Sequence, residues 1–308
     1  MCFFIRIECN HQIGMGHYAR MTNLMESMNE DAIYLVTKES NAFQSKVKED
    51  VLVIEDEVND VITNAEKYQP KAIIYDLLNY SNIEFSKIKD KLNVPVIAFH
   101  EKNHWVNPEI LNINYNTFEG WEDMTDTGLF GPKYIIFNPK INKASKKTDE
   151  KLFVSFGGSD PNNIMRWFIE NILPKVSFKK IMLHFGPLAS YLNEYSNIEN
   201  SMVGIYRAPV NLHEVSQSCS RALVAGGNTM YEMVYQGLTT LVIAQNSHQE
   251  EFARNADRHS LLKYLGGYPE LDENEVIKEL NNSYSFNQNN LIDGHGSKRI
   301  GNKIKTLI

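Results

Sequence analysis

Short apolar runs alternate with helix-forming stretches along this chain, and the alternation restricts the folds that are open to it. Runs that are apolar at nearly every position are typical of parallel strands buried on both faces of a sheet. Strands that alternate with helices indicate βαβ units around an open parallel sheet. The runs are residues 3–8, 33–36, 51–54, 72–75, 94–98, 152–156, 181–185, 222–225 and 240–244. The sequence therefore predicts an α/β fold.

The length and one polar stretch indicate how this fold is divided. The chain has 308 residues, which is enough for two domains of ordinary size. A polar stretch at residues 142–151 separates the earlier apolar runs from the later ones. We predict two Rossmann-like domains with parallel sheets, residues 1–144 and 150–308, and a cleft between them. Residues 292–308 predict a final helix, which can pack back.

Charge and apolar patterning exclude several classes of protein. The net charge of −7 argues against nucleic-acid binding, as does the lack of a basic cluster beyond the short stretch Lys143, Lys146 and Lys147. No window approaches the roughly 20 apolar residues of a membrane helix, so no membrane insertion is expected. The three cysteines, Cys2, Cys9 and Cys219, and the scattered histidines match no metal-ligand spacing. We therefore expect a cytoplasmic protein without metal or cofactor, and the pattern leaves its oligomeric state open.

A glycine turn follows the first apolar run, at residues 14–17. A helix that begins there presents unpaired N–H groups and a positive dipole end to an anion. Open α/β sheets bind ligands at the carboxyl ends of their strands, where this turn is expected. We therefore predict that Gly14, Gly16, Arg20 and Asp76 bind substrate and that His17 is a general base, with a helix cap as the alternative role of Asp76. A purely structural role for His17 in packing the turn stays open.

A second glycine turn, at residues 226–229, is the better signal for a phosphate site. Two adjacent glycines let the backbone approach a diphosphate closely, and the dipole of the following helix favours its charge. The predicted nucleotide-binding residues are Gly226, Gly227, Asn228, Thr229 and Glu232. Two readings of Glu232 stay open: it accepts hydrogen bonds from ribose hydroxyls, or it completes a capping box with Thr229.

Two further groups of polar residues follow apolar runs of the second half. Gly158 and Asp160 belong to a third glycine turn and are predicted to contact the substrate. The alternative is a simple turn in which Asp160 is a helix N-cap and Pro161 is the first helical residue. Asn246 and Gln249 follow the run at 240–244, and we predict that they hydrogen-bond a sugar, although a solvated loop explains them equally.

Five motifs occur together and in order. They are Gly14-x-Gly16-His17-x-x-Arg20, Gly131-Pro132-Lys133-Tyr134, Phe156-Gly157-Gly158-Ser159-Asp160-Pro161, Ala225-Gly226-Gly227-Asn228-Thr229-x-x-Glu232 and Asp293-Gly294-x-Gly296-x-Lys298-Arg299. On these residues the chain resembles the UDP-sugar hydrolase of pseudaminic acid biosynthesis and the related spore-coat polysaccharide biosynthesis proteins. More distantly, residues 226–256 are similar to the peptidoglycan N-acetylglucosaminyltransferase of the GT-B fold.

The resemblance implies two GT-B-like domains, with UDP held mainly by the C-terminal one. It implies that His17 activates water against the anomeric carbon of a UDP-linked N-acetylated deoxy sugar, of the UDP-2,4-diacetamido-2,4,6-trideoxyhexose type, so that UDP and free sugar result. The chain departs from the hydrolase pattern at Leu78, at His100-Glu101 and at Asn138, where the sugar is expected. Two alternatives stay open: a UDP-sugar-dependent glycosyltransferase of the GT-B fold, and a non-catalytic nucleotide-sugar-binding subunit.

Overall fold

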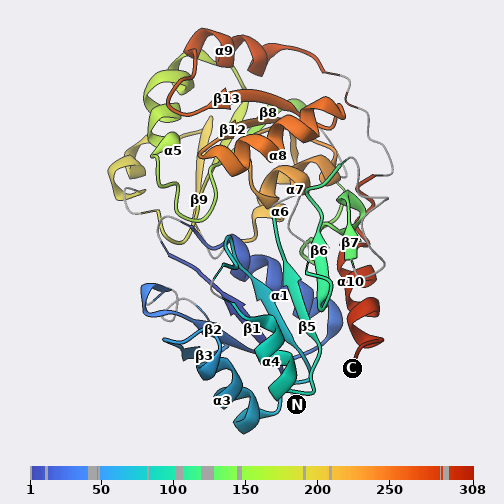
Figure 1. Cartoon of the computed structure of the whole chain (residues 1–308). Coiled ribbons are helices and arrows are strands. Elements are labelled where there is room, and N and C mark those ends of the chain that lie inside the picture. The colour runs from blue at the N-terminus through green and yellow to red at the C-terminus, as the bar shows by residue number, and fades with distance from the viewer. Residues whose placement is uncertain are drawn as a thin grey trace. The chain divides into compact units, whose positions relative to one another are not determined.

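The computed structural model divides the chain into two compact α/β units (Figure 1). The first unit is Met1–Pro139 with Asp293–Ile308, and the second is Lys140–Ile292. Residues 293–308, which the sequence analysis grouped with the second domain, thus belong to the first unit. The structure describes residues 2–10, 13–40, 47, 49–81, 83–101, 107–118, 128–143, 148–189, 192–207, 210–284, 286 and 291–308.

The first unit is built on a parallel sheet of seven strands in the order β3-β2-β1-β4-β5-β6-β7. The strands are β1 Phe3–Ile7, β2 Ala32–Val36, β3 Asp50–Val53, β4 Ile73–Asp76, β5 Val96–Phe99, β6 Leu111–Asn114 and β7 Gly128–Phe130. The helices are α1 Gly16–Met28, α3 Asn59–Tyr68, α4 Phe85–Lys91 and α10 Gly296–Lys305, with 3₁₀ turns at Lys38–Ser40 and Pro132–Tyr134. One hydrophobic cluster joins sheet residues to Val61 of α3 and Ile88 of α4.

Helix α1 forms because its apolar residues repeat at helical spacing. Met21, Leu24, Met25 and Met28 are all buried, as the sequence predicts. The last helix, α10, packs against α1 and the Pro132–Tyr134 turn of the same unit. Gly296 permits this approach, because a Cβ on it would lie 2.1 Å from the carbonyl oxygen of Ile135.

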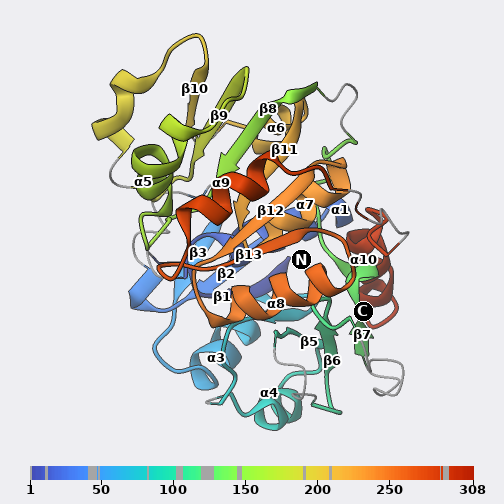
Figure 2. The same cartoon turned by 90° about the horizontal axis from the view of Figure 1, so that it is seen from above.

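The second unit has a parallel sheet of six strands in the order β10-β9-β8-β11-β12-β13. Figure 2 shows β10, β9 and β8 side by side in that order. The strands are β8 Thr148–Ser155, β9 Lys180–Phe185, β10 Val203–Arg207, β11 Cys219–Ala225, β12 Thr239–Ala244 and β13 Lys263–Gly267. The helices are α5 Ile164–Trp167, which continues into a π-helical turn at Phe168–Ile172, α6 Leu212–Ser216, α7 Asn228–Gln236, α8 Ser247–Arg258 and α9 Glu273–Asn281.

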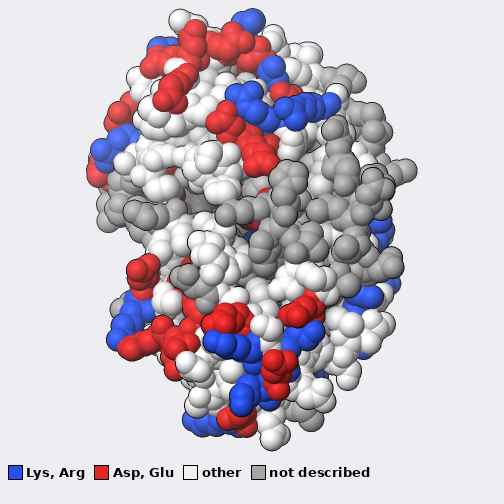
Figure 3. Space-filling model, viewed as in Figure 1, with Lys and Arg blue, Asp and Glu red and all other residues white. Residues whose placement is uncertain are grey.

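The prediction of two parallel-sheet α/β units is confirmed. On the face drawn in Figure 3, acidic and basic side chains of the described residues are interspersed, without a continuous basic surface. Within the described ranges, no helix combines the length and the apolar character needed to cross a membrane. The cleft expected between the domains stays a prediction.

Candidate functional site

The sheet order of the first unit brings His17 to Asp76, although 59 residues separate them. Strand β1 pairs with β4, and the register places Ile7 beside Asp76, the last residue of β4. The chain leaves β1 at that edge, turns through Gly14 with φ 78°, and enters α1 at Gly16. His17 and Arg20 lie in the first turns of α1 and therefore reach the carboxyl end of β4.

Asp76 is the centre of a buried hydrogen-bond network. Its side chain is 0% exposed, and its Oδ1 lies 2.8 Å from Nδ1 of His17. Arg20 donates from Nε to Oδ2 at 2.7 Å and from a terminal nitrogen to Oδ1. Arg20 also donates to the hydroxyl of Tyr115 and lies 3.5 Å from a carboxylate oxygen of Glu101. The guanidinium of Arg20, predicted to bind substrate, is thus engaged with protein groups.

This network determines which nitrogen of His17 is available for chemistry. Burial alone would raise the pKa of Asp76, but the charge of Arg20 and the hydrogen bonds from Arg20 and His17 outweigh it and hold that pKa below its ordinary value. Asp76 is therefore an ionised acceptor, so we assign the ring hydrogen of neutral His17 to Nδ1. Nε2 then carries the lone pair, and no described residue hydrogen-bonds to it. An oriented imidazole of this kind can act as a base.

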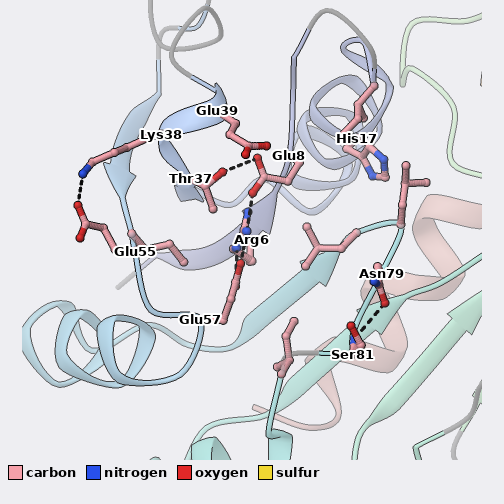
Figure 4. A pocket seen from close by; sticks show the side chains of 15 residues that line it. Arg6, Glu8, His17, Thr37, Lys38, Glu39, Glu55, Glu57, Asn79 and Ser81 are labelled. Carbon is pink, nitrogen blue, oxygen red and sulfur yellow. Dashed lines mark hydrogen bonds and ion pairs between the residues drawn. The ribbon is translucent and has the colours of Figure 1, made fainter.

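His17 lines a cavity of about 610 Å³ at the carboxyl ends of β1 to β4 (Figure 4). The wall opposite is rich in carboxylates, including Glu8, Glu55 and Glu57. The lining also includes Leu78 and Asn79, which follow β4. A cavity of this size and polarity can hold a sugar-sized molecule beside the ring.

Arg6 organises the wall of this cavity. It is only 2% exposed, and it donates from Nε to Glu57 at 2.8 Å and from a terminal nitrogen to Glu8 at 2.5 Å. Glu8 also accepts from the hydroxyls of Thr37 at 3.0 Å and Ser40 at 2.6 Å. Figure 4 shows Arg6 between the two carboxylates. These residues were not predicted from the sequence, although an arginine inside an apolar run was a usable signal.

The two glycines of the second unit have different surroundings. A Cβ on Gly226 would lie 2.7 Å from the carbonyl oxygen of Gln249, so close packing of α8 requires this glycine. Gly227 is the N-cap of α7, and nothing lies within 4 Å of where its Cβ would be. The backbone at Gly227 is therefore open to a ligand at the N-terminus of a nine-residue helix. Asn228 and Thr229 are the first two residues of that helix.

Glu232 does not cap α7, so the capping-box reading is wrong. The helix begins at Asn228, one residue before Thr229, and no side chain caps it. Glu232 instead lies in the second turn, 8% exposed, with Oε1 3.8 Å from Nε2 of His213. Burial raises the pKa of Glu232, and the neighbouring His213 opposes this only in part. A buried carboxylate with open acceptor positions suits the other reading, a ribose contact.

Asn246 and Gln249 hold two strand ends together. Oε1 of Gln249 accepts from the backbone N–H of Gly226 at 3.2 Å and of Gln245 at 3.0 Å. Asn246 is the N-cap of α8 and accepts from the N–H of Gln249 at 3.0 Å. These bonds position the glycine turn of α7, and a sugar contact by either residue stays a prediction.

Asp160 bonds to the first turn of α5, but it is not the N-cap that the sequence indicated, because that position belongs to Asn163. Its two carboxylate oxygens accept from the N–H groups of Ile164 at 2.9 Å and Met165 at 2.8 Å. Helix α5 begins at Ile164, so Pro161 is not its first residue, and the prediction of that start was wrong. The carbonyl of Gly158 accepts from Leu188 at 2.9 Å. A substrate contact by Gly158 or Asp160 stays a prediction.

The chain is similar in sequence to two proteins of other organisms. No family model matches the chain. It is 27% identical over 268 residues to an uncharacterized protein of Methanocaldococcus jannaschii, covering 78% of this chain but only 55% of that protein. It is 24% identical over 296 residues to the spore coat polysaccharide biosynthesis protein SpsG of Bacillus subtilis, covering 87% of this chain and 84% of that protein.

Solved structures with a similar fold are glycosyltransferases. MurG of Acinetobacter baumannii superposes with a TM-score of 0.63 at 10% identity, covering 99% of this chain and 100% of that one. The spinosyn rhamnosyltransferase SpnG, in complex with thymidine diphosphate, superposes with a TM-score of 0.55 at 12% identity, covering 100% and 96%. At these identities the likeness concerns the fold. The chain therefore has the GT-B fold of glycosyltransferases and is similar in sequence to a polysaccharide biosynthesis protein.

Proposed function

We propose that this protein is a UDP-sugar-dependent glycosyltransferase of the GT-B type, in which the second unit binds UDP and His17 is the general base. The observation that carries the proposal is the buried pair of His17 and Asp76, which leaves a lone pair on Nε2 beside a cavity. The similarity to a spore coat polysaccharide biosynthesis protein supports a nucleotide sugar as the donor. The glycosyltransferases of like fold support transfer as the reaction.

The proposed reaction moves one proton and one glycosyl group. An acceptor hydroxyl gives its proton to Nε2 of His17, and its oxygen attacks the anomeric carbon of the donor. The bond between that carbon and the phosphate oxygen breaks, and its electron pair leaves with UDP. Asp76 holds the ring in the required tautomer and stabilises the imidazolium that forms. The backbone at Gly227 and the dipole of α7 receive the diphosphate, and Glu232 receives the ribose.

The volume beside His17 is large enough for an organic acceptor, and it would equally take the donor sugar together with a water molecule. The cavity measures about 610 Å³, whereas one water takes up about 30 Å³ of liquid. Hydrolysis is the second candidate, since the same base would activate water. The five motifs that begin at residues 14, 131, 156, 225 and 293 favour it, because they resemble the UDP-sugar hydrolase of pseudaminic acid biosynthesis.

The test is UDP release from a panel of UDP-sugars, with and without candidate acceptors. Release that requires an acceptor supports the glycosyltransferase. Release in buffer alone supports the hydrolase, and UDP binding without any turnover supports a non-catalytic nucleotide-sugar-binding subunit.

A variant of His17 tests the base directly. His17→Asn cannot take the proton, so turnover should fall by about 10²–10⁴ while UDP affinity stays close to wild type. The control is His295→Asn, since His295 is an exposed histidine at the N-cap of α10 in the same unit. Near-full turnover of a folded His17→Asn variant, with chemistry rate-limiting, would assign the base to another residue.

A further inference from the structure

The wall of the cavity beside His17 carries more carboxylates than cations. Its charged side chains are those of Glu8, Glu39, Glu55, Glu57, Arg6 and Lys38. Lys38 and Glu55 pair with each other in solvent, since both side chains are 70% exposed. Arg6 is shared by Glu8 and Glu57, so this group keeps one negative charge. Glu39 is exposed and forms no ion pair with a described residue, so the wall has two uncompensated negative charges (Figure 4).

His17 gives an independent indication that this cavity receives a ligand. The residue is 6% exposed and belongs to the lining. Its Nδ1 lies 2.8 Å from Asp76, whereas no described residue hydrogen-bonds to Nε2. A polar atom of a buried side chain is costly to leave without a partner, so a bound hydroxyl would complete the bonding of the ring.

The uncompensated charge restricts what this ligand can be. An anion would be repelled by the carboxylates, and both cations of the wall are already paired. A neutral sugar donates hydroxyl hydrogens but leaves the charge of the wall uncompensated. A protonated amine compensates the charge and has three N–H donors for carboxylate oxygens, in hydrogen bonds that are stronger than those between neutral groups.

Glu8 and Glu57 differ in how far their acceptor positions are filled. Glu8 accepts from Arg6 at 2.5 Å and from two hydroxyls at 3.0 Å and 2.6 Å. Among the described residues, Glu57 accepts from Arg6 alone, which holds its side chain and leaves further lone pairs open. The open acceptor positions of Glu57 and Glu39 are therefore the ones available to a ligand.

We propose that this cavity selects a protonated amine through Glu57 and Glu39, so that the acceptor is an amine-bearing alcohol such as an amino sugar with a free amino group. The inference rests on the proposed function, because it takes the cavity beside Nε2 of His17 as the acceptor site. A protonated amine has no lone pair, so the hydroxyl remains the nucleophile that gives its proton to His17. Acetylation of the amine would remove the charge and two of its three N–H donors.

The experiment measures the binding of monosaccharides to the wild-type protein without nucleotide, by NMR titration of the backbone amides of Leu78 and Asn79, which line the cavity. Glucosamine is compared with glucose, which has a hydroxyl in place of the amine, at a pH at which the amine is protonated. Glucosamine should bind at least about tenfold more tightly, as expected for hydrogen bonds between charged groups. N-acetylglucosamine should bind no better than glucose, and glucuronic acid should bind more weakly than both.

Variants and matched controls then assign the preference to the wall. Glu57→Gln and Glu39→Gln each remove one negative charge and should lower the ratio of glucosamine to glucose affinity several-fold. Glu30→Gln is the control for Glu57, since Glu30 is a glutamate of the same unit that also forms an ion pair, is 16% exposed against 23% for Glu57, and lies outside the lining. Glu66→Gln, at an exposed position of α3, is the control for Glu39. Both controls should keep the wild-type ratio.

Equal affinity of wild type for glucosamine and glucose overturns the amine selectivity, and so does a ratio that falls as far in the controls as in the cavity variants. A ratio that is unchanged in both Glu57→Gln and Glu39→Gln also overturns it. If Glu57→Gln fails to fold because Arg6 loses a partner, Glu39→Gln decides alone, since Glu39 is exposed and unpaired. If no sugar shifts the two amides, the cavity is not a sugar site.

A second pair of ligands separates an amine on the acceptor from an amine on the donor sugar. UDP-glucosamine and UDP-N-acetylglucosamine should bind with similar affinity in wild type and in Glu57→Gln. A preference for UDP-glucosamine that Glu57→Gln removes would place the amine on the donor and overturn the acceptor assignment. Absence of UDP release with every acceptor, while the preference for glucosamine persists, would refute the proposed transfer reaction and leave the amine selectivity standing.

Discussion

Replacing Asp76 by Asn removes a negative charge from the centre of a buried network. The carboxylate is 0% exposed and the Arg20 side chain is 8% exposed, so neither charge has access to much solvent. Breaking a buried ion pair by neutralising one partner typically costs about 3–5 kcal/mol, because the other charge stays buried. Folding free energies are about 5–15 kcal/mol in total. We therefore expect Asp76→Asn to remove a large part of the stability of the first unit.

The same unit contains a matched control. Asp293 and Arg299 also form a two-contact pair, with one bond of 2.7 Å, but their side chains are 29% and 37% exposed. An ion pair open to solvent is typically worth about 0–1 kcal/mol, so Asp293→Asn should cost little. The two variants therefore make the same chemical change at the same type of pair, and they differ in burial.

The measurement is urea-induced unfolding followed by circular dichroism, with hydrogen exchange to locate the loss. Because each unit has a hydrophobic cluster of its own, exchange should rise in α1 and β4 of the Asp76→Asn variant and stay unchanged in the second unit. A loss of unfolding free energy that is the same in the two variants, within about 1 kcal/mol, would contradict a role of burial in the strength of the Asp76–Arg20 pair. An unchanged exchange of α1 and β4 would contradict it as well.

Three further predictions follow from the same structure. The pKa of Asp76 is held below its ordinary value in the folded protein. The Asp76 carboxylate therefore stabilises the fold above the unfolded pKa of about 3.9, and this stabilisation is lost as the pH falls through the folded pKa. The urea midpoint should consequently fall more steeply with decreasing pH in wild type than in Asp76→Asn. Gly227→Val should fold normally but bind UDP at least tenfold more weakly, or about 1.4 kcal/mol, by calorimetry, and unchanged affinity would move the nucleotide elsewhere. Gly226→Ala should lose about 1–3 kcal/mol in thermal or urea unfolding because its Cβ meets Gln249, whereas Gly16→Ala, with nothing within 4 Å, should not show this loss.

Several strands could not be found by apolar patterning. Strand β6 reads Leu-Asn-Ile-Asn, and Asn112 is buried because its side chain donates to the carbonyls of Asn107 at 2.7 Å and Ile110 at 2.9 Å. Strand β13 ends in two glycines, which patterning treats as a turn. In both, hydrogen bonding and pairing with a neighbouring strand compensate for a weak local preference.

In the candidate sites, too, local features could be predicted from the sequence, whereas contacts between distant residues could not. The glycine turns were visible in the sequence because a turn at a strand end is a local property. The first residue of α7 was not visible in the sequence, because the helix starts at Asn228, one residue before Thr229. Glu232 lies near His213 of another helix and does not cap its own helix. The choice between the two predicted roles of Glu232, a helix cap or a ribose contact, thus depended on the residues that pack against it.

The sequence by itself determined the parallel α/β class, the two-part organisation and the strand-end turns, because these depend on apolar period and on residues adjacent along the chain. Only the tertiary structure decided that His17 meets Asp76, that Arg6 and Glu57 build a cavity wall, and that the last helix belongs to the first unit. These contacts join residues far apart in sequence. They are set by strand order and helix packing, which leave little buried charge unpaired in the unit. Neither strand order nor helix packing produces a periodic pattern in the sequence.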